Sequence, residues 1–299
     1  MAVNYFDNGS STFSADYTTN YSMIEKFAKQ MIFQVQSTNP LAWIDKGEVR
    51  NGVAVEQAIT QLLESSEWVS EIQDGSTLNA PSYPTINVQY FYDWTSKQFK
   101  TTVSEDQIRK ALLADMTEMD IASKIVSNLT ESEGYEDYEA SKGLLTSAIS
   151  AGNIVSAGTA TVGTSLITSI KNITDEMQYV NNSYLGYVVA NTTSDYKTRT
   201  PFERLHIIMP YTIYNELNVE VLASLYNLDK ARLLDKITLI DTTDGIVYIV
   251  DEFGLLKYRR LYKMTSKYVE DALYSNYWLT VSRMYGSSNL FKMAYLTVT

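Results

Sequence analysis

The feature that most constrains the fold of this chain is its longest helical pattern, which runs from Asp120 to about Ile149. Apolar residues spaced four apart mark one face of the pattern near each of its ends: Ile121, Ile125 and Leu129, then Leu145 and Ile149. Gly134 and Gly143 interrupt the pattern, and each glycine costs about 1 kcal/mol in a helix interior. We therefore expect one long helix that bends or breaks near these glycines.

Segments that favour strands lie on both sides of this helix. The region 45–103 resembles an excursion of strands and turns, because β-forming residues alternate from Thr85 to Phe99. Further strands are expected at Leu205–Met209, Lys236–Ile240 and Ile246–Val250, and in two runs around Gly286 between Trp278 and Val298. Asp244-Gly245 predicts a hairpin between the second and third of these strands. Strands and helices without a regular βαβ rhythm indicate an α+β fold.

Shorter helices and a linker complete the expected organisation. Residues 1–22 are polar and irregular and predict an extended arm. Residues 150–164 are small and mark a boundary between two lobes. The remaining helices are expected at Met23–Val35, after the cap Ser104, at Ser165–Tyr184, from Pro210 to Leu217, and after the caps Asn218 and Asp229.

The chain has few side chains that could build a catalytic or metal site. It contains no cysteine and one histidine, His206, which excludes disulfides, zinc ribbons, thiol catalysis and multi-histidine metal sites. His206 lies within an apolar strand, where a structural role is expected. Phosphate-loop, dinucleotide, nucleophile-elbow and zinc-protease motifs are absent from the sequence. We predict no catalytic, cofactor-binding or metal-binding residues.

One carboxylate pair leaves an enzymatic alternative open. Asp251 and Glu252 follow a strand, where catalytic carboxylates can occur. Neighbouring residues of a strand point to opposite faces, so the pair is poorly placed to act together. A solvated strand end is the simpler interpretation, and a hydrolase or transferase would depend on these two carboxylates alone.

The charge of the chain limits its partners. The formal net charge is −11, whereas a protein that grips nucleic acid usually carries a basic face. This balance still suits a shell that encloses DNA without holding it tightly. Residues 1–20 lack the features of a signal peptide, and the uncharged stretch 143–170 is too polar for a membrane span. We expect no association with membranes.

Two charge runs and several aromatic residues are candidates for contacts between subunits. The acidic run 131–139 includes Glu136 and Glu139, and the basic run 257–267 includes Arg259 and Arg260. Two solvated faces would explain both runs, but we hypothesise that they meet across a subunit boundary. The chain is also rich in tyrosine, which suits either β-rich cores or subunit contacts. The candidate aromatic contacts in the arm and loop are Phe6, Trp68, Tyr83 and Tyr90.

Several stretches resemble the major capsid proteins of small tailed bacteriophages. Residues 103–145, VSEDQIRKALLADMTEMDIASKIVSNLTESEGYEDYEASKGLL, resemble the helix that follows an extended loop and the long spine helix after it. The preceding NPLAWIDKGEVRNGVAVEQ (39–57) is similar to the entry into that loop. RLHIIMPYTIYNELNVEVLASLYN (204–227) and ALYSNYWLTVSRMYGSSNLFKMAYL (272–296) are similar to the apical and returning strands.

The resemblance implies the HK97-type capsid fold. Its parts would be an N-terminal arm at 1–38, an extended β-hairpin loop at 45–103, a peripheral domain at 104–160 and 264–299, and an apical domain at 165–263. The chain would then be a capsid protein of the virion, assembled in the host bacterial cytoplasm as pentamers and hexamers around DNA without sequence-specific binding. A portal and decoration proteins are possible partners, and we expect any scaffolding protein to be separate.

Two other structural roles are compatible with the sequence. An encapsulin-like nanocompartment shell shares the fold but holds a protein cargo. Another virion part, such as a tail or portal-associated protein, would form tubes or rings and not closed shells.

Overall fold

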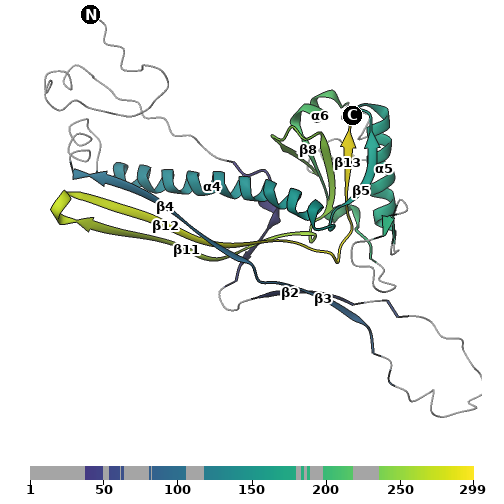
Figure 1. The fold of residues 1–299 in the computed structure, drawn as a ribbon, viewed down its shortest axis with the longest axis horizontal. Helices are drawn as coiled ribbons and strands as arrows, with labels where there is room; N and C mark the ends of the chain where they lie inside the picture. Colours follow the sequence, from purple (N-terminus) through teal and green to yellow (C-terminus); the bar gives the residue numbers. More distant parts are fainter. Residues whose placement is uncertain are drawn as a thin grey trace, which may run out of the picture.

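A compact lobe and an elongated lobe make up the protein, and a two-stranded ribbon projects from near their junction (Figure 1). The computed structural model describes residues 38–49, 54–60, 62–63, 81, 83–105, 118–179, 183–184, 187–188, 198–217 and 236–299. The predicted arm therefore lies outside the described residues, except for Thr38. Four predicted helices also lie outside them: the helix at 23–35, the helix after Ser104 beyond Glu105, and the two helices after Asn218 and Asp229.

The compact lobe is built on a five-stranded sheet with the order β5-β13-β10-β8-β9. These strands are β5 (Val155–Ala160), β13 (Met293–Val298), β10 (Ile246–Asp251), β8 (Leu205–Pro210) and β9 (Ile237–Ile240). The pairs at the two edges, β5 with β13 and β8 with β9, are parallel, and the inner pairs are antiparallel. The other elements of this region are α5 (Thr164–Gln178), α6 (Tyr211–Glu216), η2 (Phe202–Arg204), β6 (Ser183–Tyr184) and β7 (Tyr187–Val188).

Both faces of this sheet are buried, which explains its nearly continuous apolar strands. Val247 and Ile249 of β10 pack with apolar residues of α5 and α6 on one face. Tyr248 and Val250 point the other way and pack against the end of α4 (Glu118–Ser150) and the short helix η1 (Ala42–Ile44). The alternation of side chains along β10 thus separates two hydrophobic cores, and the sheet forms the middle of three layers.

The elongated lobe consists of a four-stranded sheet beside α4. The sheet has the order β1-β11-β12-β4, formed by β1 (Asp45–Glu48), β11 (Leu255–Val269), β12 (Tyr274–Ser287) and β4 (Trp94–Ser104). The short helix η3 (Glu270–Ala272) connects β11 to β12. Leu129 of α4 packs with Leu279 and Val281 of β12, which are both buried. The helix therefore shields the central strand of this sheet from solvent on one face.

The long helix is unbroken over 33 residues, so the predicted break near Gly134 and Gly143 is wrong. Its two ends take part in different cores, with Leu129 in the elongated lobe and Leu145 in the compact lobe. Buried apolar contacts at both ends outweigh the modest cost of two helical glycines.

Three other local predictions are corrected by the strand pairing. The predicted hairpin around Asp244-Gly245 is wrong, because β8 lies between β9 and β10. The predicted linker 150–164 contains β5, an edge strand of the compact lobe. Gly286 lies inside β12, where a Cβ atom would come within 2.5 Å of the Phe91 ring, so glycine is needed there for close packing and not for a turn.

The strand pairing also departs from the expected domain boundaries. β11 runs continuously across the boundary expected between residues 263 and 264. β13, expected in the peripheral domain, lies in the five-stranded sheet. Within the described residues of the region 45–103, β1 and β4 belong to the four-stranded sheet, and β2 (Val55–Thr60) and β3 (Ile86–Phe91) form the projecting ribbon.

Candidate functional site

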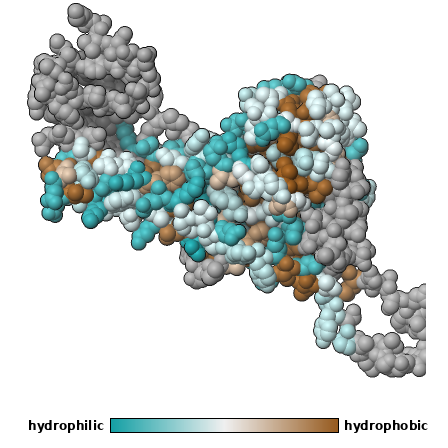
Figure 2. All heavy atoms as spheres, viewed as in Figure 1, coloured by the Kyte–Doolittle hydropathy of each residue, from teal (hydrophilic) through white to brown (hydrophobic). Residues whose placement is uncertain are grey.

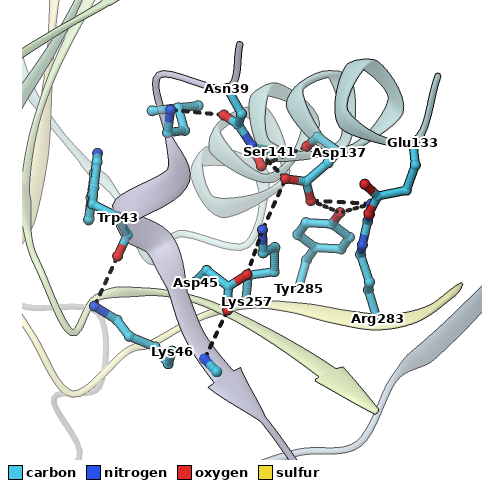
Figure 3. Close-up of polar contacts among 12 residues, drawn as sticks. Asn39, Trp43, Asp45, Lys46, Glu133, Asp137, Ser141, Lys257, Arg283 and Tyr285 are labelled. Atoms are coloured by element: carbon cyan, nitrogen blue, oxygen red, sulfur yellow. Dashed lines mark hydrogen bonds and ion pairs between the residues drawn. The ribbon is translucent and has the colours of Figure 1, made fainter. Parts of the chain in front are cut away.

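A buried ionic network lies between α4 and the four-stranded sheet of the elongated lobe, with Asp137 of α4 at its centre (Figure 3). The Oδ2 atom of Asp137 accepts hydrogen bonds from Asn39 Nδ2 at 2.6 Å and from Lys257 Nζ at 3.0 Å. Its Oδ1 atom accepts one from Tyr285 Oη at 2.8 Å and lies 3.3 Å from Arg283 Nη1. One helical carboxylate thus holds the segment before β1 and two strands of the elongated sheet.

Two further carboxylates complete the network. Asp45 of β1 lies 3.0 Å from Lys257 Nζ, and Glu133 of α4 is ion-paired with Arg283. The side chains of Lys257, Arg283 and Asp137 are each less than a tenth exposed. Burial raises the pKa of Tyr285, and the negative charge of Asp137 raises it further, so Tyr285 remains a neutral donor. Both buried cations have carboxylate partners, as a folded interior requires.

The segment before β1 also contacts the compact lobe. The ring of Trp43 stacks on His206 of β8, with centroids 3.9 Å apart and planes inclined by 4°. Leu41 and Ile44 are buried in the core between α4 and the five-stranded sheet. His206 thus has the structural role expected of it, and residues 39–45 connect both lobes.

Asp251 and Glu252 occupy separate environments. Asp251 is fully buried, and its carboxylate pairs with Arg204, accepts a hydrogen bond from Thr200 Oγ1 at 2.8 Å and accepts another from the Phe253 amide. The predicted solvated strand end is therefore wrong for Asp251. Glu252 lies 3.4 Å from Lys46 Nζ, so the two carboxylates have different partners.

The acidic and basic runs meet inside one subunit through Asp137 and Lys257. Among the predicted interface residues, Glu136 is ion-paired with Lys97, and Glu139 lies 2.7 Å from Lys142.

The two predicted arginines lie beside aromatic rings of their own subunit. The guanidinium of Arg259 is 5.3 Å from the Tyr262 ring centroid, and that of Arg260 is 4.9 Å from Trp94. These internal contacts engage part of the charge that the hypothesis assigned to a neighbouring subunit, and the subunit contact stays a prediction.

On one face of the ribbon, β3 presents apolar side chains to solvent beside polar and small side chains of β2. Ile86, Val88 and Tyr90 of β3 alternate on one face and are 56, 39 and 56% exposed. Tyr83, just before β3, is 82% exposed. The two other predicted aromatic contacts, Phe6 and Trp68, lie outside the described residues. Exposed apolar residues that share one face of a projecting element mark an interaction surface.

The opposite face of the ribbon is attached to the body of the subunit. Gln57 Nε2 donates to the Phe253 carbonyl at 3.0 Å, and Gln89 Nε2 donates to the Ser287 carbonyl at 3.3 Å. Phe91 packs with Leu256 and Met284 of the elongated sheet. The apolar face is therefore held in a defined orientation where the ribbon leaves the body.

Figure 2 shows that hydrophobic residues elsewhere on the visible surface lie among hydrophilic ones, most densely on the compact lobe.

A second polar cluster joins α4 to the end of β9. Asp241 accepts hydrogen bonds from Tyr138 Oη at 2.5 Å and from Lys142 Nζ at 3.0 Å, and these bonds lower its pKa. Two shallow recesses of about 300 and 350 Å³ lie beside Asp241. Across the described ranges, no three His, Asp or Glu side chains are grouped so that they could hold a metal ion. None of the helices that can be followed in the structure is long and apolar enough to cross a membrane.

Lys292 lies buried at the C-terminal end of α5, and its Nζ donates to the Tyr179 carbonyl at 3.0 Å. Burial lowers the pKa of Lys292 to about 8, although Glu176 opposes the shift. Between pH 8 and about 10.4, the reference pKa of lysine, the unfolded chain therefore binds more protons at this residue than the folded chain.

We expect the stability of the protein to rise, relative to that of the Lys292→Met variant, as the pH increases from 8 to about 10. The cause is that the folded protein no longer buries a charge at this position once Lys292 is neutral. Urea unfolding of both proteins across this range measures the difference. A gap between them that stays constant with pH would contradict the prediction.

Comparison with known proteins identifies the relatives of the chain. The profile of the Phi29-like phage major capsid protein family matches residues 8–297. The major capsid protein of Bacillus phage PZA is 24% identical over 91% of this chain and 62% of its own length. That of Bacillus phage B103 is 21% identical over 89% of this chain and 60% of its length. The chain thus spans about three-fifths of the length of these relatives.

Solved capsid structures share the fold. The capsid structure of Staphylococcus phage Andhra matches with a TM-score of 0.73 and 11% identity, over 91% of this chain and 87% of that chain. The capsid structure of cyanophage P-SCSP1u matches with a TM-score of 0.63 and 10% identity, over 91% of this chain and 92% of that one. The mixed arrangement of helices and sheets described above is therefore a phage capsid fold.

Proposed function

The chain belongs to the Phi29-like phage major capsid protein family, and on that premise we propose that its copies assemble into the icosahedral head that encloses the double-stranded DNA of a tailed bacteriophage. The exposed apolar face of the ribbon carries this proposal. Ile86, Val88 and Tyr90 lie on an element that projects from the body, where a neighbouring subunit can cover them. Symmetric repetition of such a contact generates a closed shell.

We assign the parts of the chain to the parts of the HK97-type fold as follows. The helix α4 would be the spine helix, and the four-stranded sheet beside it the peripheral domain. The compact lobe would be the apical domain, the ribbon the tip of the extended loop, and residues 1–38 the arm. These assignments keep the proposed parts and take their boundaries from the observed sheets.

The shell contacts are proposed to include the exposed aromatics and the charged residues chosen from the sequence. Tyr83 and Tyr90 belong to the ribbon region, and Phe6 and Trp68 are proposed contacts of the arm and loop. Arg259 and Arg260 remain proposed partners for acidic residues of a neighbour. The internal pairing of Glu136 and Glu139 supports a smaller contribution from these two acids.

The proposed role is structural and requires no catalysis, metal or cofactor. The carboxylates of the enzymatic alternative, Asp251 and Glu252, are engaged by Arg204 and Lys46, which supports a structural role for both. Pentamers and hexamers assembled in the host cytoplasm, a portal, a separate scaffolding protein and decoration proteins belong to the same proposal. No sequence-specific reading of the DNA is proposed.

Expression of the protein, alone and with neighbouring genes of its source genome, tests this function. Negative-stain electron microscopy is expected to show closed, thin-walled icosahedral particles. A monomer under every condition, with coexpressed partners included, would refute the shell. Tubes or rings would indicate another virion part, and a protein cargo inside closed particles would indicate a nanocompartment.

A further inference from the structure

One face of the elongated sheet is basic although the chain as a whole is strongly acidic. Opposed residues of antiparallel strands lie on the same face, so the strand register defines that face row by row. On the face away from α4, the rows are Leu261, Ser282 and Ser96; Lys263, Thr280 and Gln98; Thr265, Trp278 and Lys100; and Lys267, Asn276 and Thr102. These rows contain lysines and polar residues but neither Asp nor Glu.

Side-chain contacts confirm that the rows share one face. Hydrogen bonds join Ser96 to Ser282 at 3.1 Å, Gln98 to Thr280 at 3.1 Å, and Thr102 to Asn276 at 2.6 Å. The alternate residues, Leu279 and Val281 among them, pack on the other face with Leu129 of α4. The lysines therefore point away from the helix.

The three lysines of this face are placed to meet a large anion. Lys100, Lys263 and Lys267 are exposed, and the Nζ atom of Lys100 lies 5.8 Å from the centroid of the Trp278 ring. Lys263 and Lys267 are four residues apart on β11, which corresponds to about 13 Å along a strand. This spacing suits several phosphates of a nucleic acid backbone, and exposed lysines on a sheet surface suit phosphate contact more than base readout.

From this arrangement we propose that the face formed by Lys100, Lys263 and Lys267 contacts the phosphate backbone of the enclosed DNA. The inference rests on the proposed function, because it requires a shell with DNA inside. A neighbouring subunit is the competing occupant. Four acids of α4 that such a neighbour could offer already have cationic partners within their own subunit: Glu133, Glu136, Asp137 and Glu139 pair with Arg283, Lys97, Lys257 and Lys142. DNA phosphates are paired only with mobile counterions, which lysines displace on binding.

The test compares two variants that lose the same positive charge. Lys100→Gln, Lys263→Gln and Lys267→Gln together neutralise the face. The control variant removes the same amount of positive charge elsewhere. It combines Lys97→Gln, on the face of β4 toward α4, with Lys124→Gln in α4 and Lys171→Gln in α5. Soluble subunits of each protein are titrated with a short fluorescein-labelled DNA duplex over a range of salt concentrations. Thermal unfolding verifies that each protein is folded, and electron microscopy scores its particles.

The face variant is expected to form shells but to bind the duplex more weakly. Its slope of log affinity against log salt should fall by about 0.9 for each lysine that contacts phosphate, while the control variant keeps the wild-type slope. Equal slopes for both variants would overturn the inference and leave the shell intact. A folded face variant that fails to form shells, when the control succeeds, would assign the face to a subunit contact. Absence of shells from the wild-type protein would remove both the proposed function and the inference.

Discussion

The double substitution Val88→Asp and Tyr90→Asp is expected to abolish closed shells and to leave a folded, soluble subunit. Both side chains lie on the exposed face of β3, where they are 39 and 56% exposed. Their removal therefore costs the isolated subunit little packing. In a shell, two unpaired carboxylates would be buried in every copy of an apolar contact, and many weak contacts act together in such a lattice. Size-exclusion chromatography and negative-stain microscopy would record the loss of particles.

A matched control separates the position of the charges from their number. Asn128→Asp and Thr130→Asp place the same two negative charges on exposed positions of α4. The side chain of Thr130 bonds only locally, to the Val126 carbonyl. This variant is expected to assemble. Shells at the wild-type yield from the Val88→Asp and Tyr90→Asp protein would refute the ribbon face as a subunit contact.

The substitution Asp137→Ala is expected to lower the free energy of unfolding by about 3–5 kcal/mol, the range for breaking a buried ion pair, because two buried cations share this carboxylate. Lys257 and Arg283 would each lose a carboxylate, and Asn39 and Tyr285 would lose their acceptor. Asp45 and Glu133 would remain as single partners of the two cations. Urea unfolding of soluble subunits, followed by tryptophan fluorescence, measures the loss.

A partly exposed ion pair on the same helix provides the comparison. Glu139 lies 2.7 Å from Lys142, but its side chain is 41% exposed, and Lys142 keeps Asp241 as a partner. Glu139→Ala is expected to change the free energy of unfolding by about 1 kcal/mol or less. A comparable effect of the two substitutions would show that Asp137 is not the centre of the network.

Elements with a strong local pattern could be predicted well from the sequence. The spine-like helix was predicted from Asp120 to about Ile149 and spans Glu118–Ser150. Strands predicted at Leu205–Met209 and Ile246–Val250 differ by one residue from β8 and β10. Their hydrophobic spacing reports directly which side chains face a core, and that spacing is a local property of the chain. The resemblance to capsid proteins agrees with the family match over residues 8–297.

Pairings between distant segments could not be predicted in the same way. The turn signal Asp244-Gly245 is present, but β9 pairs with β8, and β10 pairs with β8 and β13 in a sheet that has a hydrophobic core on each face. The Asp137 network is also invisible to local patterns. The network joins Asn39, Asp45, Asp137, Lys257 and Arg283, which lie far apart in the sequence. No local spacing rule connects these residues.

The sequence by itself determined the class of the fold, the long helix, most strands, the lack of thiol and multi-histidine chemistry and the resemblance to a capsid family. Only the tertiary structure decided which strands are neighbours, which charges are buried together and which apolar face is left uncovered. The physical reason is that periodicity records the burial of each residue, whereas pairing and exposure depend on which distant segments fold against it. The acidic run 131–139 shows the difference, because one strongly charged stretch holds both the partly exposed Glu139 and the buried Asp137.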